Sequence, residues 1–180
     1  MRTTTVVPTG VEKRFRPDQV IVSKTDRQGR LTYVNPVFVE ISGYAEADLI
    51  GKPHNVIRHP DMPRSIFKLL WETISSGAEL FAYVVNLSAD GGHYWVLAHV
   101  TPTIDPSGAI VGYHSNRRTP DARALSVVQA LYRDLLAAER AATSSPDALA
   151  AGSALLAARL AEAGMDYDRW IWSLETGVAA

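Results

Sequence analysis

The stretch Gly51-Lys-Pro-His-Asn-Val-Ile-Arg-His-Pro-Asp-Met-Pro63 places unlike chemistries in a short segment directly before a strong helical pattern. Its prolines, Pro53, Pro60 and Pro63, limit helix continuation and bias each preceding residue towards extended geometry. Between them lie two imidazoles, a guanidinium and a carboxylate. Such a segment is either a rigid connector or a ligand clamp, and the flanking elements distinguish the two.

The residues on both sides of this stretch are typical of short helices. From Pro63 to Ser76 apolar residues recur at i, i+3, i+4, i+7 and i+8, which predicts an amphipathic helix that Gly77 ends. Upstream, Asn35-Pro36 is typical of a helix start and Gly43 of its end. The apolar face of the Pro63–Ser76 helix must cover a sheet or a ligand.

Five β-rich segments flank these helices. Tight-turn residues at 26–29, 90–92 and 105–108 join neighbouring segments into hairpins. The predicted strands lie at residues 20–22, 30–34, 80–87, 93–104 and 109–115. The sequence therefore predicts an α+β fold, a five-stranded antiparallel sheet with short helices on one face.

The chain divides into three parts. Residues 1–19 show no clear pattern and are expected to form an extended or loosely ordered arm, residues 20–118 a sensor domain, and residues 119–180 a C-terminal helical region. In this last part Leu125, Val128, Tyr132 and Leu135 share one helix face. Ser145-Pro146 is typical of a second helix start, and Asp166 of the cap of a last short helix.

Composition excludes several classes of function. The 180 residues carry a formal net charge of −1, which disfavours binding to nucleic acid or to an anionic membrane. No apolar run approaches the roughly 20 residues of a transmembrane helix, and the N-terminus lacks a signal-peptide core, so a cytoplasmic protein is expected. The absence of cysteine excludes disulfides, thiolate metal sites and cysteinyl-flavin photochemistry.

Five motifs, taken in order, resemble a PAS domain, and more narrowly the FAD-binding PAS domain of Aer-type aerotaxis and energy-taxis receptors. They are Thr25-Asp-Arg-Gln-Gly-Arg30, Tyr33-Val-Asn-Pro36, Ser42-Gly-Tyr44, Gly51–Pro63 and Asp90-Gly-Gly-His-Tyr-Trp-Val96. The resemblance covers roughly residues 20–118. Without a membrane span or a long coiled-coil rod, the chain is similar to the PAS-only half of bipartite energy-taxis systems. This resemblance implies a ligand cleft between sheet and helices.

The resemblance also implies a set of FAD-binding positions. These fall on Asn35, Arg58, His59, Asp61, Phe67, Trp71 and Asn86. Aer-like domains often carry a tryptophan in the strand after Gly77, and Leu80 occupies that place here. Phe81 or Trp95 would then supply the aromatic wall.

Each of these residues also has a purely structural interpretation. Arg58 and His59 could be surface loop residues, and Asp61 could cap the following helix by accepting the backbone N–H of Arg64. Asn35 has the sequence context of an N-cap. The helix positions of Phe67 and Trp71 fit a core as well as a cofactor wall.

Asn86 stands apart, because it lies between Val85 and Leu87 in an otherwise apolar strand. An inward-facing amide needs a hydrogen-bond partner. A flavin edge offers both a donor and an acceptor, and reduction would change which amide atom is preferred. Asn86 is therefore the candidate for reading the redox state.

The expected function is noncovalent FAD binding by a redox or oxygen sensor, not an enzyme, that relays its state to a methyl-accepting chemoreceptor or other signalling protein. One alternative is a haem-binding gas sensor, in which an inward histidine among His93, His99 and His114 ligates iron. Another is a ligand-free PAS scaffold or dimerisation module, and the C-terminal helices would suit a homodimer. His54, His59 and Asp61 are weak metal-ligand candidates.

Overall fold

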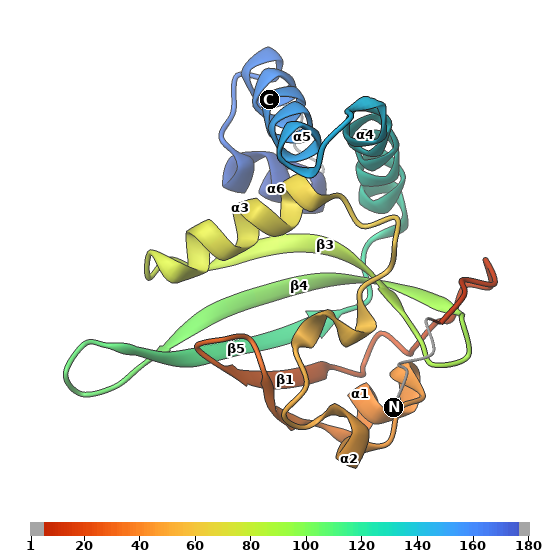
Figure 1. Cartoon of the computed structure of the whole chain (residues 1–180), viewed down its shortest axis with the longest axis vertical. Helices are drawn as coiled ribbons and strands as arrows, with labels where there is room; N and C mark the ends of the chain where they lie inside the picture. The colour runs from red at the N-terminus through yellow and green to blue at the C-terminus, as the bar shows by residue number, and fades with distance from the viewer. Residues whose placement is uncertain (1–5, 177–180) are drawn as a thin grey trace.

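A five-stranded antiparallel sheet forms the centre of the molecule, as the sequence predicts. The computed structural model describes residues 6–176. The strands are β1 (Ile21–Asp26), β2 (Leu31–Val34), β3 (Leu80–Leu87), β4 (His93–Ile104) and β5 (Ile110–Arg118), in the order β2-β1-β5-β4-β3 (Figure 1). Strand β5 runs to Arg118 rather than to Ser115, because its last residues pair with both β1 and β4. The last strand of the chain thus lies at the centre of the sheet.

Short helices cover one face of this sheet, hereafter the inner face. They are α1 (Pro36–Ser42), α2 (Glu46–Leu49), the 3₁₀ turn η1 (His54–Ile57) and α3 (Arg64–Ser75). The predicted N-cap of α1 is confirmed: Asn35 Oδ1 accepts the backbone N–H groups of Phe38 and Val22, each at 3.0 Å. Helix α3 lies along β3 and β4 and buries Ile66, Leu70 and Ile74.

Three further helices continue the chain after the sheet: α4 (Ala122–Ala141), α5 (Ser145–Glu162) and α6 (Tyr167–Thr176). Among residues 6–176 no single helix is long and apolar enough to cross a membrane, although α5 and α6 together, bent by 61°, reach the required length and composition.

These helices pack around the β3 edge of the sheet. Helix α5 packs on α3, whereas α4 and α6 cover the outer face of β3 (Figure 1). The Tyr132 hydroxyl donates to the Tyr83 carbonyl at 2.6 Å, and the Tyr83 hydroxyl donates to Glu175. The C-terminal region is therefore packed against the sheet domain from both faces, and only residues 177–180 of it lie outside the described part.

The N-terminal arm is docked rather than loose over much of its length. Residues 1–5 lie outside the described part, but Thr9 and Lys13 donate their backbone N–H groups to Gly91 and His93 at 2.8 and 2.7 Å. Lys13 also pairs with Asp90 at 2.7 Å. The arm thereby lies along the turn that joins β3 to β4.

Candidate functional site: a cavity between the sheet and α3

A cavity opens between the inner face of the sheet and helix α3. The space within it that the centre of a water molecule can occupy is about 80 Å³, and it opens to solvent at the mouth. Six elements and the loop after η1 contribute its lining. These are Ser23 and Thr25 from β1, Val84 and Asn86 from β3, Ala98 and Val100 from β4, Tyr113, His114, Ser115 and Arg117 from β5, Phe67, Leu70, Trp71 and Ile74 from α3, His54 from η1, and Arg58 directly after it.

A buried cation lies at the inner end of this cavity. Arg117 is only 4% exposed, and its Nη2 donates to Ser23 Oγ at 3.0 Å and to His54 Nε2 at 2.6 Å. No carboxylate among residues 6–176 forms an ion pair with it. Because an unpaired buried charge is costly, the site favours a ligand rich in acceptors or negative charge.

The protonation states of this pair follow from burial. Burial, reinforced by the neighbouring Arg117 charge, lowers the pKa of His54 to about 3, so His54 is neutral and its Nε2 accepts the guanidinium hydrogen bond. Burial lowers the pKa of Arg117 to about 10, which leaves the guanidinium charged at neutral pH. The cavity therefore keeps a fixed positive charge across the physiological range.

Several buried polar atoms in the cavity lining have no hydrogen-bond partner within residues 6–176. These are Thr25 Oγ1, Asn86 Nδ2, Ser115 Oγ and Arg117 Nη1. Two are donors only, and two are hydroxyls that donate or accept. Buried groups of this kind are normally satisfied, so their concentration in one cavity indicates a polar ligand edge.

Aromatic side chains form the mouth. The Trp71 ring meets Tyr113 edge-on with centroids 5.5 Å apart, and a Cβ added at Gly29 would lie 2.7 Å from the Trp71 ring. Gly29 has φ of +75°, so this turn position favours glycine for its backbone as well as for the space that Trp71 occupies. Trp71 thus reaches from α3 to the β1–β2 turn, and it remains 38% exposed.

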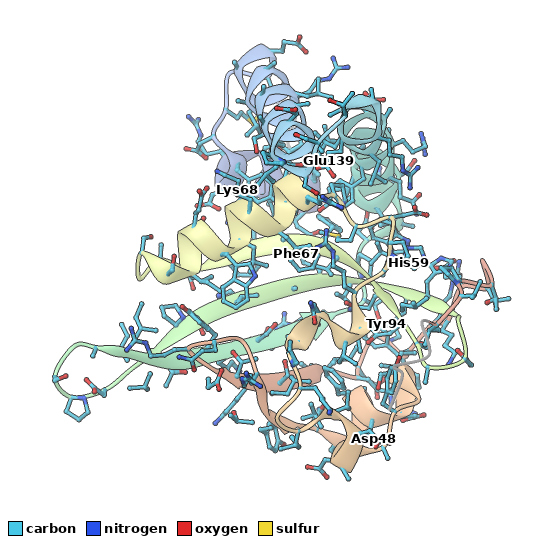
Figure 2. All side chains as sticks on the ribbon, viewed as in Figure 1. Asp48, His59, Phe67, Lys68, Tyr94 and Glu139 are labelled. Atoms are coloured by element: carbon cyan, nitrogen blue, oxygen red, sulfur yellow. The ribbon has the colours of Figure 1, made fainter. Side chains whose placement is uncertain are left out.

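The loop residue Arg58 contacts both Phe67 at the mouth of the cavity and the edge strand β3. Its guanidinium lies 4.3 Å from the centroid of the Phe67 ring, and its Nη2 donates to the Met62 carbonyl at 3.0 Å. Its backbone pairs with that of Asn86 on β3. Figure 2 shows Phe67 on the side of α3 that faces the sheet.

Four of the predicted site residues therefore converge on the cavity, namely Arg58, Phe67, Trp71 and Asn86. Asn35 does not line it, because its amide is committed to the cap of α1 and to the Val20 carbonyl. His59 is buried outside the cavity, where its Nδ1 accepts the Asp61 backbone N–H at 3.1 Å. Burial lowers the pKa of His59.

Two predictions are corrected by the structure. Asp61 does not cap α3: it pairs with Arg140 at the surface at 2.6 Å, whereas the Arg64 backbone N–H donates to Glu139. Trp95 and Phe81 do not line the cavity either. Strand alternation turns both to the outer face, where Trp95 packs on Tyr132 and Phe81 stacks on His99.

Arg117, His54, Ser23 and Ser115 carry the polar chemistry of the cavity but were not among the predicted residues. A signal for two of them is present in the sequence, since Tyr113, Ser115 and Arg117 alternate along β5 and so share a face. What that face meets depends on β5 lying between β1 and β4.

Comparison with known proteins agrees with this geometry. Residues 31–117 match a family described as the PAS fold. The sheet and its inner-face helices have the PAS fold. Over 118 residues, 66% of this chain, the sequence is 39% identical to the aerotaxis receptor of Escherichia coli (strain K12). Over 99 residues, 55% of the chain, it is 30% identical to the nitrogen fixation regulatory protein of Klebsiella pneumoniae.

The matched region is a minor part of each of these relatives. The chain spans 23% of the length of the aerotaxis receptor and 20% of that of the nitrogen fixation regulatory protein. Among solved structures, the dark form of the blue-light photoreceptor Aureochrome1 LOV shares the fold with a TM-score of 0.55 at 21% identity, covering 61% of this chain and 82% of that one. The family match of residues 31–117 ends before α4 and so lies within the sheet domain.

Proposed function

We propose that this chain is a signal-sensing PAS protein that binds FAD noncovalently and uses it as a redox or oxygen sensor. The observation that carries the proposal is the cavity itself, in which a buried unpaired arginine and an unsatisfied Asn86 amide face an aromatic mouth. A flavin ring combines a flat apolar body with an edge of carbonyl and imide groups. The flat body of such a ring would pack against the aromatic mouth, and its polar edge would bond the unsatisfied groups of the cavity.

The residues present fit this cofactor in named roles. Arg117 and Asn86 would donate to ring acceptors, Ser115 and Thr25 would donate or accept, and Trp71 and Phe67 would supply the apolar walls. A bound flavin supplies one- or two-electron exchange. The chain itself orients the ring, excludes water from its inner edge and holds a positive charge there.

The aerotaxis receptor similarity supports a sensory role rather than catalysis. We propose that the state of the cavity is relayed to a methyl-accepting chemoreceptor or another signalling protein in the cytoplasm, by one chain or by a homodimer. Asn86 and Arg117 are the residues placed to respond to the state of the ring. The helices that pack on α3 and β3 are the route by which such a response would leave the domain.

The haem alternative is less well supported. His54 is the histidine whose side chain reaches the cavity from the loop, and its Nε2 is 2.6 Å from Arg117 Nη2, so that nitrogen is not free to bind iron. His93 and His99 alternate with the inward-facing residues of β4 and lie on the outer face, whereas His114 on β5 is among the residues that line the cavity. A ligand-free scaffold would leave the polar atoms of the cavity unexplained.

The absorption spectrum of the purified full chain, before and after FAD is added, tests the proposal. Flavin bands that stay with the protein through gel filtration are the expected result. A Soret band would instead identify a haem protein, and no retained chromophore after FAD addition would identify a scaffold. Replacing Arg58 by Ala is expected to abolish FAD retention while far-ultraviolet circular dichroism stays unchanged.

A further inference from the structure

A groove continues from the mouth of the cavity along the outer side of α3. The cavity and the groove share Arg58, Phe67 and Trp71, so the two lie next to each other at the mouth. The far wall of the groove is the beginning of α5, which belongs to the C-terminal helices. The groove is therefore built jointly by the PAS domain and the helices appended to it.

The groove is positively charged. Arg58, Arg64 and Lys68 line it together with the amide of Asn55, and no acidic residue does. Arg64 Nη1 donates to Ser145 Oγ at 2.8 Å, which ties α3 to the first turn of α5. Figure 2 shows Lys68 on the side of α3 away from Phe67, towards α5. Lys68 pairs with Glu72 at 2.7 Å on the surface of α3, whereas Arg58 and Arg64 have no carboxylate partner for their side chains within residues 6–176. Guanidinium groups in this arrangement favour a phosphate-bearing ligand.

The α5 wall adds an apolar surface suited to a flat base. The N-terminus of this 18-residue helix is already capped, because Ser144 Oγ accepts the Asp147 backbone N–H at 3.2 Å. Next to Ser145, the side chains of Pro146 and Leu149 give an apolar surface facing Trp71 across the groove. A phosphate pair and a flat base thus both find matching walls within the same groove.

We propose that this groove holds the ADP half of the flavin dinucleotide, so that α5 is a wall of the cofactor site. This proposal rests on the proposed function, since it extends the ligand from the cavity outwards. The site then prefers FAD to FMN and to riboflavin, and occupation of the groove fixes the first turn of α5 against α3. Cofactor loading and the position of the C-terminal helices become linked through Arg64 and Ser145.

The test measures the affinity of the full chain for riboflavin, FMN and FAD by isothermal titration calorimetry. The double substitution Arg64→Gln with Lys68→Gln is expected to weaken FAD binding at least tenfold and to leave riboflavin binding unchanged. Arg159→Gln is the matched control, because Arg159 lies near the other end of α5 and pairs with Asp134 and Glu162. Its FAD affinity should equal that of the wild type.

Hydrogen exchange gives a second readout that does not depend on affinity. Backbone amides of residues 145–149 should be more protected with FAD than with riboflavin at saturation, and equal protection would contradict the groove assignment. Equal affinity for FAD and riboflavin, unchanged by the double substitution, would overturn the inference while leaving flavin binding intact. Failure of all three flavins to bind would instead remove the proposed function and the inference together.

ADP alone separates a cofactor subsite from an independent nucleotide site. ADP should compete with FAD and leave riboflavin binding unaffected, because it occupies the groove and not the cavity. Tight ADP binding in the presence of saturating FAD would place the nucleotide elsewhere and would also overturn the inference.

Discussion

Arg117 is the residue whose charge matters most to the proposed chemistry, because it is buried, unpaired and in the cavity wall. Reduction adds negative charge to a flavin ring, and a nearby fixed cation stabilises that charge. Replacing Arg117 by Gln should therefore make the midpoint potential of the bound flavin more negative, on the order of tens of millivolts, where about 30 mV corresponds to 1.4 kcal/mol for two electrons.

Arg117→Lys is the matched comparison, since it keeps the charge and changes the shape. Its midpoint potential, measured by spectroelectrochemical titration of the flavin-loaded protein, should stay closer to that of the wild type. Equal potentials in the Gln and Lys variants would show that the charge of residue 117 does not act on the ring.

His54 makes the stability of the fold sensitive to acid. Its pKa of about 3 in the folded protein lies below the ordinary value of 6.5, so the unfolded chain binds the proton more readily as the pH falls between these values. Folding stability is therefore lost from pH 6.5 downwards. Between pH 7 and pH 5 this single group accounts for a loss of about 2 kcal/mol.

Replacing His54 by Gln removes the titrating group and keeps an acceptor for Arg117. Urea unfolding of both proteins at pH 7 and pH 5 measures the effect, and the drop in unfolding free energy should be about 2 kcal/mol smaller in the variant. Equal drops in the two proteins would mean that His54 is protonated in the folded state.

Residues whose role follows from their neighbours in the sequence were predictable. Residues whose role follows from how distant strands pair were not. Asn35 was recognisable as a cap from the Asn-Pro step, and Asn86 from its place in an apolar strand. Arg117 stands beside Arg118 near a predicted strand end, and only its pairing with both Ile21 and Ala98 buries it. No local pattern encodes a pairing across more than 90 residues.

At the scale of elements, Glu139 joins the C-terminal helices to α3, which forms one wall of the cavity. From α4 its carboxylate accepts the backbone N–H groups of Arg64 and Ser65, each at 2.9 Å, and the Ser65 hydroxyl at 2.8 Å. Helix α3 begins at Arg64, and Pro63 at its N-cap position has no side chain that could accept a hydrogen bond, so this distant carboxylate takes the role of the cap. Figure 2 shows Glu139 at this end of α3.

Gly152 on α5 allows this helix to approach Glu139 of α4 and Ser65 of α3 closely, because it has no side chain. A Cβ at this position would lie 2.6 Å from Glu139 Oε1 and 2.9 Å from Ser65 Oγ, so no larger residue fits without displacing one of them. The spacing of Glu139 four residues after the buried Leu135 was a readable sign that it faces inwards. Its partner could not be predicted, because α3 lies more than 70 residues earlier.

Glu139→Gln is expected to lower the free energy of unfolding by about 2 kcal/mol, because one charged acceptor of two backbone N–H groups becomes a donor amide. Urea denaturation of the full chain measures this loss. Glu162→Gln is the control, since Glu162 is exposed and pairs with Arg159 at the surface, and its effect should stay within about 0.5 kcal/mol. A similar small change in both variants would remove Glu139 as the cap of α3.

At the scale of the whole molecule, the C-terminal helices hold the PAS domain from both sides of its β3 edge. Helix α5 rests on α3, which walls the cavity, while α4 and α6 cover the opposite face of β3 and β4. The sequence predicted these helices as an appendage, because their pattern shows which residues are apolar but not which surface receives them. The shared contacts make them a third layer of the same unit.

This arrangement predicts what happens when the helices are removed. A chain ending at Arg118 would uncover Tyr83 and Val85, which are buried in the full chain, together with the side of Trp95 that packs on Tyr132. It would also leave the N-terminus of α3 without Glu139. Such a fragment should bind the dye ANS strongly and self-associate, because large exposed apolar patches drive association.

ANS fluorescence and gel filtration with light scattering compare this fragment with the full chain. A second fragment ending at Gly164 separates the contributions of the helices, since it loses α6 and the Glu175 contact with Tyr83 but retains Glu139. It should show intermediate dye binding and a preserved α3. A monomeric, ANS-silent fragment ending at Arg118 would show that the sheet domain is complete without its helices, and that α4 and α6 rest on a surface that is stable when bare.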